Sequence, residues 1–137
     1  MAKRVLVVDD HAPTRTLIRT ILESEKSGTY EVVEAASGTE CLKAADSKGP
    51  FDLILLDVNL PDMEGYDVCR AIRHVHKTVP ILFITARSEM KDYTAGREAG
   101  GDSYVVKPIA RASLRSLVAL FTGLGRRSGE SPEKPAT

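Results

Sequence analysis

The chain has 137 residues, the size of one typical domain, and is long enough to bury a core without disulfides or a structural metal. Lys and Arg total 19, and Asp and Glu also total 19, so the formal net charge is +0. This balance argues against general affinity for nucleic acid or for an anionic membrane, since both need a surplus of basic side chains.

Two further observations concern the compartment. No apolar run approaches the roughly 20 residues that a transmembrane helix needs, so we expect no membrane contact. Cys41 and Cys69 are the only cysteines and lack metal-ligand spacing. We expect them to be buried, reduced thiols, which favours a cytoplasmic protein.

Strand and helix patterns alternate in the first half of the chain. Residues 5–8 are a continuous apolar run, which predicts a strand buried on both faces. Apolar residues with helical spacing follow Pro13, a residue favoured in the first turn of a helix. Residues 31–35 have the mixed polarity of an edge strand, and Ser37 and Glu40 then have the spacing of a capping box at the start of a second helix.

The second half continues the alternation. Residues 53–56 and 79–84 predict two more buried strands, and residues 103–106 predict a strand nearer an edge. Three helical patterns accompany them, marked by Met63, Tyr66, Val68, Cys69 and Ile72, by Met90, Tyr93, Thr94 and Arg97, and by Leu114, Leu117, Val118 and Phe121. Residues 123–137 are polar and predict a disordered tail, so the expected domain spans residues 1–122.

Five alternations of strand and helix predict an α/β fold, in which helices cover both faces of a parallel sheet in three layers. In such sheets the functional residues lie at the carboxyl ends of the strands. The polar residues that follow the central and final strands are Asp9, Asp10, Asp57, Asn59, Thr85 and Lys107.

These side chains suggest phosphoryl chemistry. Carboxylates held close together repel one another, and Mg²⁺ with oxygen ligands would neutralise them. A metal-bound carboxylate can attack phosphorus, while an ammonium and a hydroxyl stabilise the transferring group. The alternative is that the aspartates only cap helices. For Asp9 or Asp10 alone, helix capping explains the residue as well as phosphoryl chemistry does. It is a poor explanation for all the strand-end residues together.

The chain resembles the receiver domain of two-component response regulators over about residues 3–122. The motifs that carry the resemblance are the apolar run ending in Asp9-Asp10, the strand before Asp57, the LPDMEG turn at 60–65, Thr85-Ala86, and YVVKP at 104–108. The resemblance, closest in kind to single-domain chemotaxis regulators, implies a flavodoxin-like, doubly wound sheet of five parallel strands in the order 2-1-3-4-5, with five helices.

The resemblance also implies roles for the acidic residues. Asp57 would be the phosphoacceptor, and a sensor histidine kinase or a histidine phosphotransfer protein would supply the phosphoryl group. Asp10, Asp57 and the backbone carbonyl of Asn59 would hold Mg²⁺, and Asp9 would act mainly through water.

Further roles follow from the same resemblance. Lys107 would pair with the phosphoryl oxygens, Thr85 would donate its hydroxyl to one of them, and Tyr104 would be the switch aromatic. The Lys107-Pro108 peptide would be cis and would direct the lysine into the site. Arg87 stands two residues after Thr85, and Asn59 two after Asp57, at positions that influence dephosphorylation in this family.

We therefore expect a phosphorylation-controlled signalling switch and not an enzyme, apart from its own phosphorylation and autodephosphorylation. The effector would bind the face formed by the fourth helix, fifth strand and fifth helix, near Tyr93, Arg111 and Arg115. The last helix lacks the charge pattern of receivers that dimerise to bind DNA, so we expect no nucleic-acid contact.

Two alternatives stay open. The chain could be the receiver part of a larger hybrid kinase or DNA-binding regulator. It could also be an aspartyl-phosphate phosphohydrolase, although that class usually has a second aspartate where this chain has Asn59.

Overall fold

The computed structural model describes residues 2–24 and 29–123, and every expected strand and helix forms there. The strands are β1 (Lys3–Val8), β2 (Tyr30–Ala35), β3 (Leu53–Leu56), β4 (Ile81–Thr85) and β5 (Ser103–Val106). The helices are α1 (Ala12–Glu23), α2 (Gly38–Ser47), α3 (Gly65–Val75), α4 (Met90–Glu98) and α5 (Arg111–Thr122). Within the described ranges, no helix has both the length and the apolar composition to cross a membrane.

The last helix of the described residues, α5, ends at Thr122. Gly123 caps this helix with a φ of 85°, in the left-handed region that favours glycine. The rest of the tail expected at residues 123–137 lies outside the described residues.

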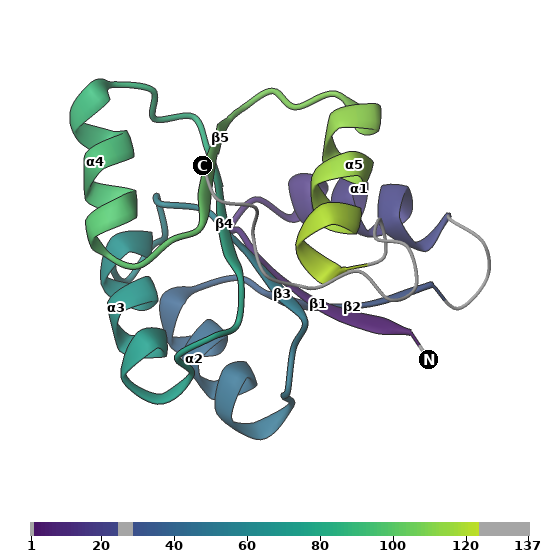
Figure 1. Ribbon diagram of the computed structural model, residues 1–137, viewed down its shortest axis with the longest axis horizontal. Helices are drawn as coiled ribbons and strands as arrows, with labels where there is room; N and C mark the ends of the chain where they lie inside the picture. The colour runs from purple at the N-terminus through teal and green to yellow at the C-terminus, as the bar shows by residue number, and fades with distance from the viewer. Residues whose placement is uncertain (1, 25–28, 124–137) are drawn as a thin grey trace.

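The five strands form one parallel sheet in the order β2-β1-β3-β4-β5 (Figure 1). β2 and β5 are the edge strands, as their mixed polarity predicts. The chain leaves β1 toward β2 on one side and returns to β3 on the other. The carboxyl ends of β1 and β3 therefore form the point where the strand order reverses, which is where such sheets bind their ligands.

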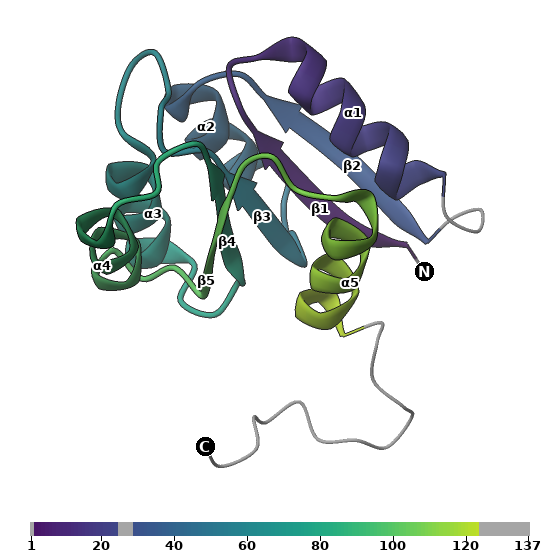
Figure 2. The ribbon, with the colours of Figure 1, turned by 90° about the horizontal axis from the view of Figure 1, so that it is seen from above.

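Helices cover both faces of the sheet. α1 and α5 lie on one face, and α2, α3 and α4 lie on the other (Figures 1 and 2). The side chains of each strand alternate between these layers: Val5 and Val7 pack toward α1 and α5, whereas Leu6 and Val8 pack toward α2 and α3. Continuous apolar strands are needed because both faces are buried.

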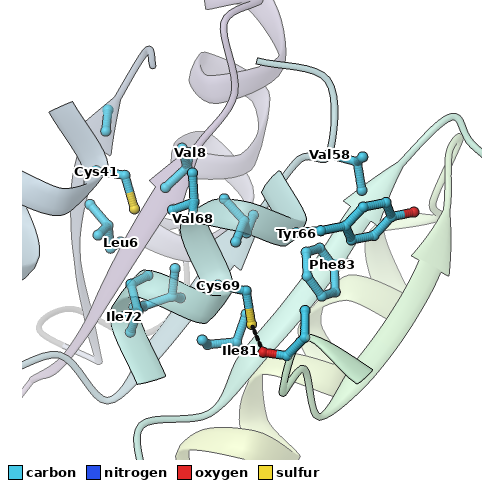
Figure 3. Close-up of a cluster of buried hydrophobic side chains, with 14 of the residues drawn as sticks. Leu6, Val8, Cys41, Val58, Tyr66, Val68, Cys69, Ile72, Ile81 and Phe83 are labelled. Atoms are coloured by element: carbon cyan, nitrogen blue, oxygen red, sulfur yellow. Dashed lines mark hydrogen bonds between the residues drawn. The ribbon is translucent and has the colours of Figure 1, made fainter. Parts of the chain in front are cut away.

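The cysteines belong to the layer on the α2, α3 and α4 side (Figure 3). Both thiols are free and buried, as expected. Burial raises the pKa of Cys41 to about 12 and that of Cys69 to about 11. The Cys69 thiol donates a hydrogen bond to the Ala99 carbonyl at 3.3 Å, so both residues are packing groups.

Two helix starts differ from the sequence pattern. α3 begins at Gly65, so Met63 precedes it. At α2 the Ser37 hydroxyl accepts from the Glu40 N–H at 3.1 Å, as the capping box predicts. The Glu40 carboxylate, however, accepts from the N–H of Ala36 at 2.8 Å and not from that of Ser37.

The orientation of α4 is a larger difference. Met90 and Tyr93, which mark this helix in the sequence, are 76% and 38% exposed. Its buried side carries Asp92, Gly96 and the capping residue Ala99. α4 covers the edge of the sheet beside β5, where small residues allow close approach and a polar one is buried.

Gly65 permits α3 to begin directly beneath the β3 terminus. A Cβ atom added there would lie 2.3 Å from the Asp57 carbonyl oxygen and 2.8 Å from the Val58 Cα. Because both neighbours are backbone atoms, we expect Gly65→Ala to lower the free energy of unfolding by about 1–3 kcal/mol. Urea denaturation would measure this. Ser116→Ala, on the exposed side of α5, is the control and should change stability by less than about 0.5 kcal/mol. Equal stability of Gly65→Ala and wild type would contradict this account of the turn.

Candidate functional site

A buried carboxylate–ammonium–carboxylate contact lies at the carboxyl ends of the strands. Asp9 follows β1 and Asp57 follows β3, and these residues are only 3% and 6% exposed. Lys107, directly after β5, places its Nζ 2.8 Å from Asp9 Oδ2 and 2.9 Å from Asp57 Oδ2. The structure therefore brings together three of the expected site residues from three different strands.

Backbone geometry fixes each member of this contact. The other oxygen of Asp9 accepts from the His11 N–H at 2.9 Å, and that of Asp57 accepts from the Asn59 N–H at 3.1 Å. Each carboxylate thus orients its own loop through a turn to the residue two positions later. The Lys107-Pro108 peptide is cis, and the Lys107 N–H donates to the Thr85 carbonyl at 2.8 Å.

The electrostatics of the site favour a further cation. Burial raises the pKa of Asp9, and the nearby charge of Asp57 acts in the same direction, while the hydrogen bonds from Lys107 and His11 oppose it. Burial tends to lower the pKa of Lys107, but its two carboxylate partners outweigh burial and raise it. Asp10 follows Asp9 in the sequence, so Asp9, Asp10 and Asp57 together with Lys107 have two more formal negative charges than positive ones.

Asp10 differs from the other acidic residues. It is exposed, and its side chain makes no hydrogen bond within the described residues. In residues 2–24 and 29–123, no three acidic, histidine or cysteine side chains form a ready-made metal cage. Mg²⁺ binds with only one or two carboxylates plus waters and phosphate oxygens, so Asp57 and Asp10, with the Asn59 carbonyl, have the donor chemistry that this ion uses.

Thr85 and Tyr104 lie on the α4 side of the contact. Thr85 is fully buried at the end of β4, and its hydroxyl accepts from the Arg87 N–H at 3.4 Å, a long hydrogen bond. The Tyr104 side chain points inward from β5, and its hydroxyl donates to the Arg87 carbonyl at 3.1 Å. The backbone of Arg87 therefore contacts both residues.

The Arg87 side chain spans the mouth of the site. Its Nε donates to Asn59 Oδ1 at 3.0 Å, and its Nη2 contacts Glu64 Oε2 at 2.8 Å. Hydrogen bonding to Glu64 is the main cause that raises the Arg87 pKa. The β3–α3 loop and the β4–α4 loop are thereby joined.

Sequence reasoning missed the buried residues that support Arg87. Asp92 is 5% exposed and lies 3.5 Å from Arg87 Nη1, and the Tyr66 ring lies under the guanidinium at 5.9 Å. The spacing of Glu89 and Asp92 is a capping box that the sequence contains and that forms at the start of α4. No local pattern distinguishes Tyr66 from an ordinary core aromatic.

Asp62 holds the β3–α3 loop from the other side. Its carboxylate accepts from the Gly38 N–H at 2.8 Å, from the Thr39 N–H at 2.9 Å and from the Thr39 hydroxyl at 2.7 Å. These hydrogen bonds, the one from the Thr39 hydroxyl first, lower the pKa of Asp62 to about 2. The loop that contains Asn59 is thus tied to the start of α2.

Comparisons with known proteins agree with this arrangement. The family model described as the response regulator receiver domain matches residues 5–119. The chain is 42% identical over 128 residues to the alkaline phosphatase synthesis transcriptional regulatory protein PhoP of Bacillus subtilis (strain 168), which covers 93% of this chain and 50% of that protein. It is 38% identical over 133 residues to the transcriptional regulatory protein TrcR of Mycobacterium tuberculosis, covering 97% and 49%. The chain spans about half the length of these relatives.

Solved structures match over almost their whole length. A CheY-like response regulator receiver domain protein from Methanospirillum hungatei JF-1 superposes with a TM-score of 0.84 at 28% identity, covering 90% of this chain and 96% of that one. The chemotaxis response regulator CheY4 of Vibrio cholerae gives a TM-score of 0.80 at 31% identity, covering 88% and 99%.

The depressed pKa of Asp62 predicts a specific loss of stability in acid. A carboxyl whose pKa is lowered on folding stabilises the protein above its unfolded pKa, near 3.8, and this contribution is lost as the pH falls toward about 2. We expect Asp62→Asn to be less stable than wild type at pH 5–7, and the difference to shrink between about pH 4 and pH 2.

Urea unfolding of both proteins across this range would test the prediction. Glu98→Gln replaces an exposed carboxylate of α4 and serves as the control, with little difference from wild type at any pH. A gap between wild type and Asp62→Asn that stays constant down to pH 2 would show that the carboxylate charge is not involved.

Proposed function

Because the chain belongs to the response regulator receiver domain family, we propose that it is a switch controlled by phosphorylation of Asp57. The observation that supports this proposal most is the Lys107 ammonium between the carboxylates of Asp9 and Asp57. A lysine so placed can move from the carboxylates to the oxygens of an incoming phosphoryl group without leaving the site.

The proposed reaction is the transfer of a phosphoryl group from a phosphohistidine. A carboxylate oxygen of Asp57 forms a new bond to phosphorus, and the bond between phosphorus and the donor imidazole nitrogen breaks. The nitrogen keeps the electron pair of that bond, and the donor returns to an ordinary histidine after protonation. The donor is a sensor histidine kinase or a histidine phosphotransfer protein.

Asp10, Asp57 and the Asn59 carbonyl would hold Mg²⁺, with Asp9 acting through water. When bound, the ion supplies positive charge to the oxygens of the transferring group. Asp9 keeps Lys107 in position through their 2.8 Å contact. The Asn59 N–H orients Asp57 through its hydrogen bond to Oδ1.

Thr85 and Tyr104 would respond to the charge of the phosphoryl group on Asp57 and change the face formed by α4, β5 and α5. The Thr85 hydroxyl would donate its proton to a phosphoryl oxygen, and its movement toward that oxygen would break the long 3.4 Å bond that it accepts from the Arg87 N–H. Tyr104 depends on the carbonyl of that same residue, so movement of Thr85 changes the packing of Tyr104 against α4. An effector protein would read the face formed by α4, β5 and α5.

The relatives of the chain suggest where the switch acts and what it controls. They are named as transcriptional regulators and are about twice as long as this chain. We propose that the domain acts in the cytoplasm and controls either a separate effector or a further domain. It would not touch nucleic acid itself, since the α5 sequence, RASLRSLVALFT, lacks the mixed acidic and basic pattern of receivers that dimerise to bind DNA.

Phosphorylation can be tested without a kinase. We expect incubation with acetyl phosphate and Mg²⁺ to add one phosphoryl group, detected by intact mass, and Asp57→Asn to remain unmodified. Asp46→Asn, at an exposed carboxylate of α2, is the matched control and should be labelled like wild type. Labelling of Asp57→Asn to the same extent would refute the assignment of Asp57. Multiple-turnover hydrolysis of phosphomonoesters would instead indicate a phosphohydrolase.

The metal site has a separate test. Removing one of two adjacent buried carboxylates relieves repulsion and desolvation, so we expect Asp9→Asn to raise stability by about 0.5–2 kcal/mol without Mg²⁺. Adding Mg²⁺ should raise the melting temperature of wild type more than that of Asp9→Asn, because the ion offsets the same repulsion. Equal responses of the two proteins to Mg²⁺, or a less stable Asp9→Asn, would contradict the electrostatic account.

A further inference from the structure

A buried polar network connects the switch aromatic to α3 and α4. The Tyr66 hydroxyl lies 3.2 Å from the Tyr104 hydroxyl, 3.2 Å from the Asp92 carbonyl and 3.3 Å from Asp92 Oδ1. Asp92 is fixed in turn, because its Oδ2 accepts from the Glu89 N–H at 3.1 Å. Tyr104 therefore has a side-chain partner in addition to the Arg87 carbonyl.

The hydroxyl protons set the direction of these bonds. Burial raises the pKa of both Tyr66 and Tyr104, so both remain protonated near neutral pH. Asp92 offers acceptors only, and Tyr66 donates to it. The lone pairs of the Tyr66 oxygen are then available to Tyr104, which donates either to them or to the Arg87 carbonyl.

Ring packing leaves the inward position well filled. Tyr66 contacts Phe83 edge-on at a centroid distance of 5.5 Å (Figure 3), and Phe83 lies 5.8 Å from Tyr104. Tyr93 meets Tyr104 from the other side at 4.8 Å. Because Phe83 is fully buried, ring packing and the hydroxyl contacts both favour the inward position of Tyr104. The Tyr66–Tyr104 hydroxyl contact can be removed without changing the ring packing.

We propose that the Tyr66 hydroxyl, held by Asp92, is a positioning group that keeps Tyr104 inward before any phosphoryl group is present. The role of Tyr104 as the switch rests on the proposed function. The anchor itself does not, because it belongs to the unphosphorylated protein. As a consequence, the unphosphorylated protein already favours the inward conformation of Tyr104. Phosphorylation then has to shift this conformational equilibrium by a smaller amount.

Tyr66→Phe removes the hydroxyl and keeps the ring against Phe83. Hydroxyl contacts of 3.1–3.3 Å are longer than optimal, so the loss of Tyr66 should shift the inward population by a roughly two- to fivefold factor. The measurement is nitration of the unphosphorylated, folded protein by tetranitromethane, followed by tryptic peptide mass analysis. Trypsin places Tyr93 in the peptide 92–97 and Tyr104 in the peptide 98–111, so each reports separately.

In wild type we expect Tyr104 to react more slowly than Tyr93. In Tyr66→Phe, Tyr104 nitration should rise two- to fivefold relative to Tyr93, because exposure increases and the phenol loses a neighbour that raises its pKa. Tyr93→Phe is the matched control. Its hydroxyl has no hydrogen bond within the described residues, and its loss should leave the nitration rate of Tyr104 equal to that of Tyr104 in wild type. A melting temperature within a few degrees of wild type confirms that Tyr66→Phe remains folded.

A second readout links the anchor to the switch. We expect Tyr66→Phe to accept phosphoryl from acetyl phosphate two- to fivefold more slowly than wild type and Tyr93→Phe. Unchanged protection of Tyr104 in Tyr66→Phe would overturn the proposal, as would a wild-type Tyr104 that reacts as fast as Tyr93. Absence of labelling in all three proteins would instead count against the proposed function, while the nitration result would still decide the anchor.

Discussion

The Lys107 ammonium lies between two buried carboxylates, and the surrounding loops are arranged to maintain that contact. Asp9 and Asp57 each use one oxygen for the lysine and the other for the backbone N–H two residues later. The same contact therefore fixes the loops after β1 and β3 and the position of β5. Three strands far apart in the sequence are joined at one point, beside the place where the strand order reverses.

This contact is unfavourable for stability in one respect. Burial raises the pKa of Asp9, which shows that its ionised form is less well solvated than in water. A core built only for stability would replace the group with an apolar one. The surrounding sheet, which is apolar on both faces, stabilises the fold enough to retain two carboxylates and an ammonium where phosphoryl chemistry needs them.

Polar contacts extend from this point toward α4. Arg87 connects the β3–α3 loop to the β4–α4 loop through Asn59 and Glu64, and its backbone carbonyl receives the Tyr104 hydroxyl. Asp92 lies buried beneath it and contacts Tyr66. These contacts form one continuous path from the end of β4 to the buried side of α4. Tyr104 also meets the ring of the exposed residue Tyr93 at 4.8 Å, so a displacement at Thr85 has a physical route to the exposed face of α4.

The sequence by itself determined the alternation of strands and helices, because continuous apolar runs and helical spacing are local patterns. It also placed Asp9, Asp57 and Lys107 at strand ends, where a parallel sheet brings them together. The residue types at these strand ends also suggested Mg²⁺-dependent phosphoryl chemistry. Strand order and the role of each individual residue came only through the family resemblance, since neither is encoded in a local pattern.

Tertiary structure alone decided the rest. It decided which side of α4 faces the sheet. Asp92 is buried on that side, whereas Met90 and Tyr93 are exposed, because the helix packs on a sheet edge through small and polar groups. It also joined Tyr66 to Tyr104 across 38 positions of sequence. Such contacts depend on how elements pack against one another, and local propensity carries no information about a partner so far away in the chain.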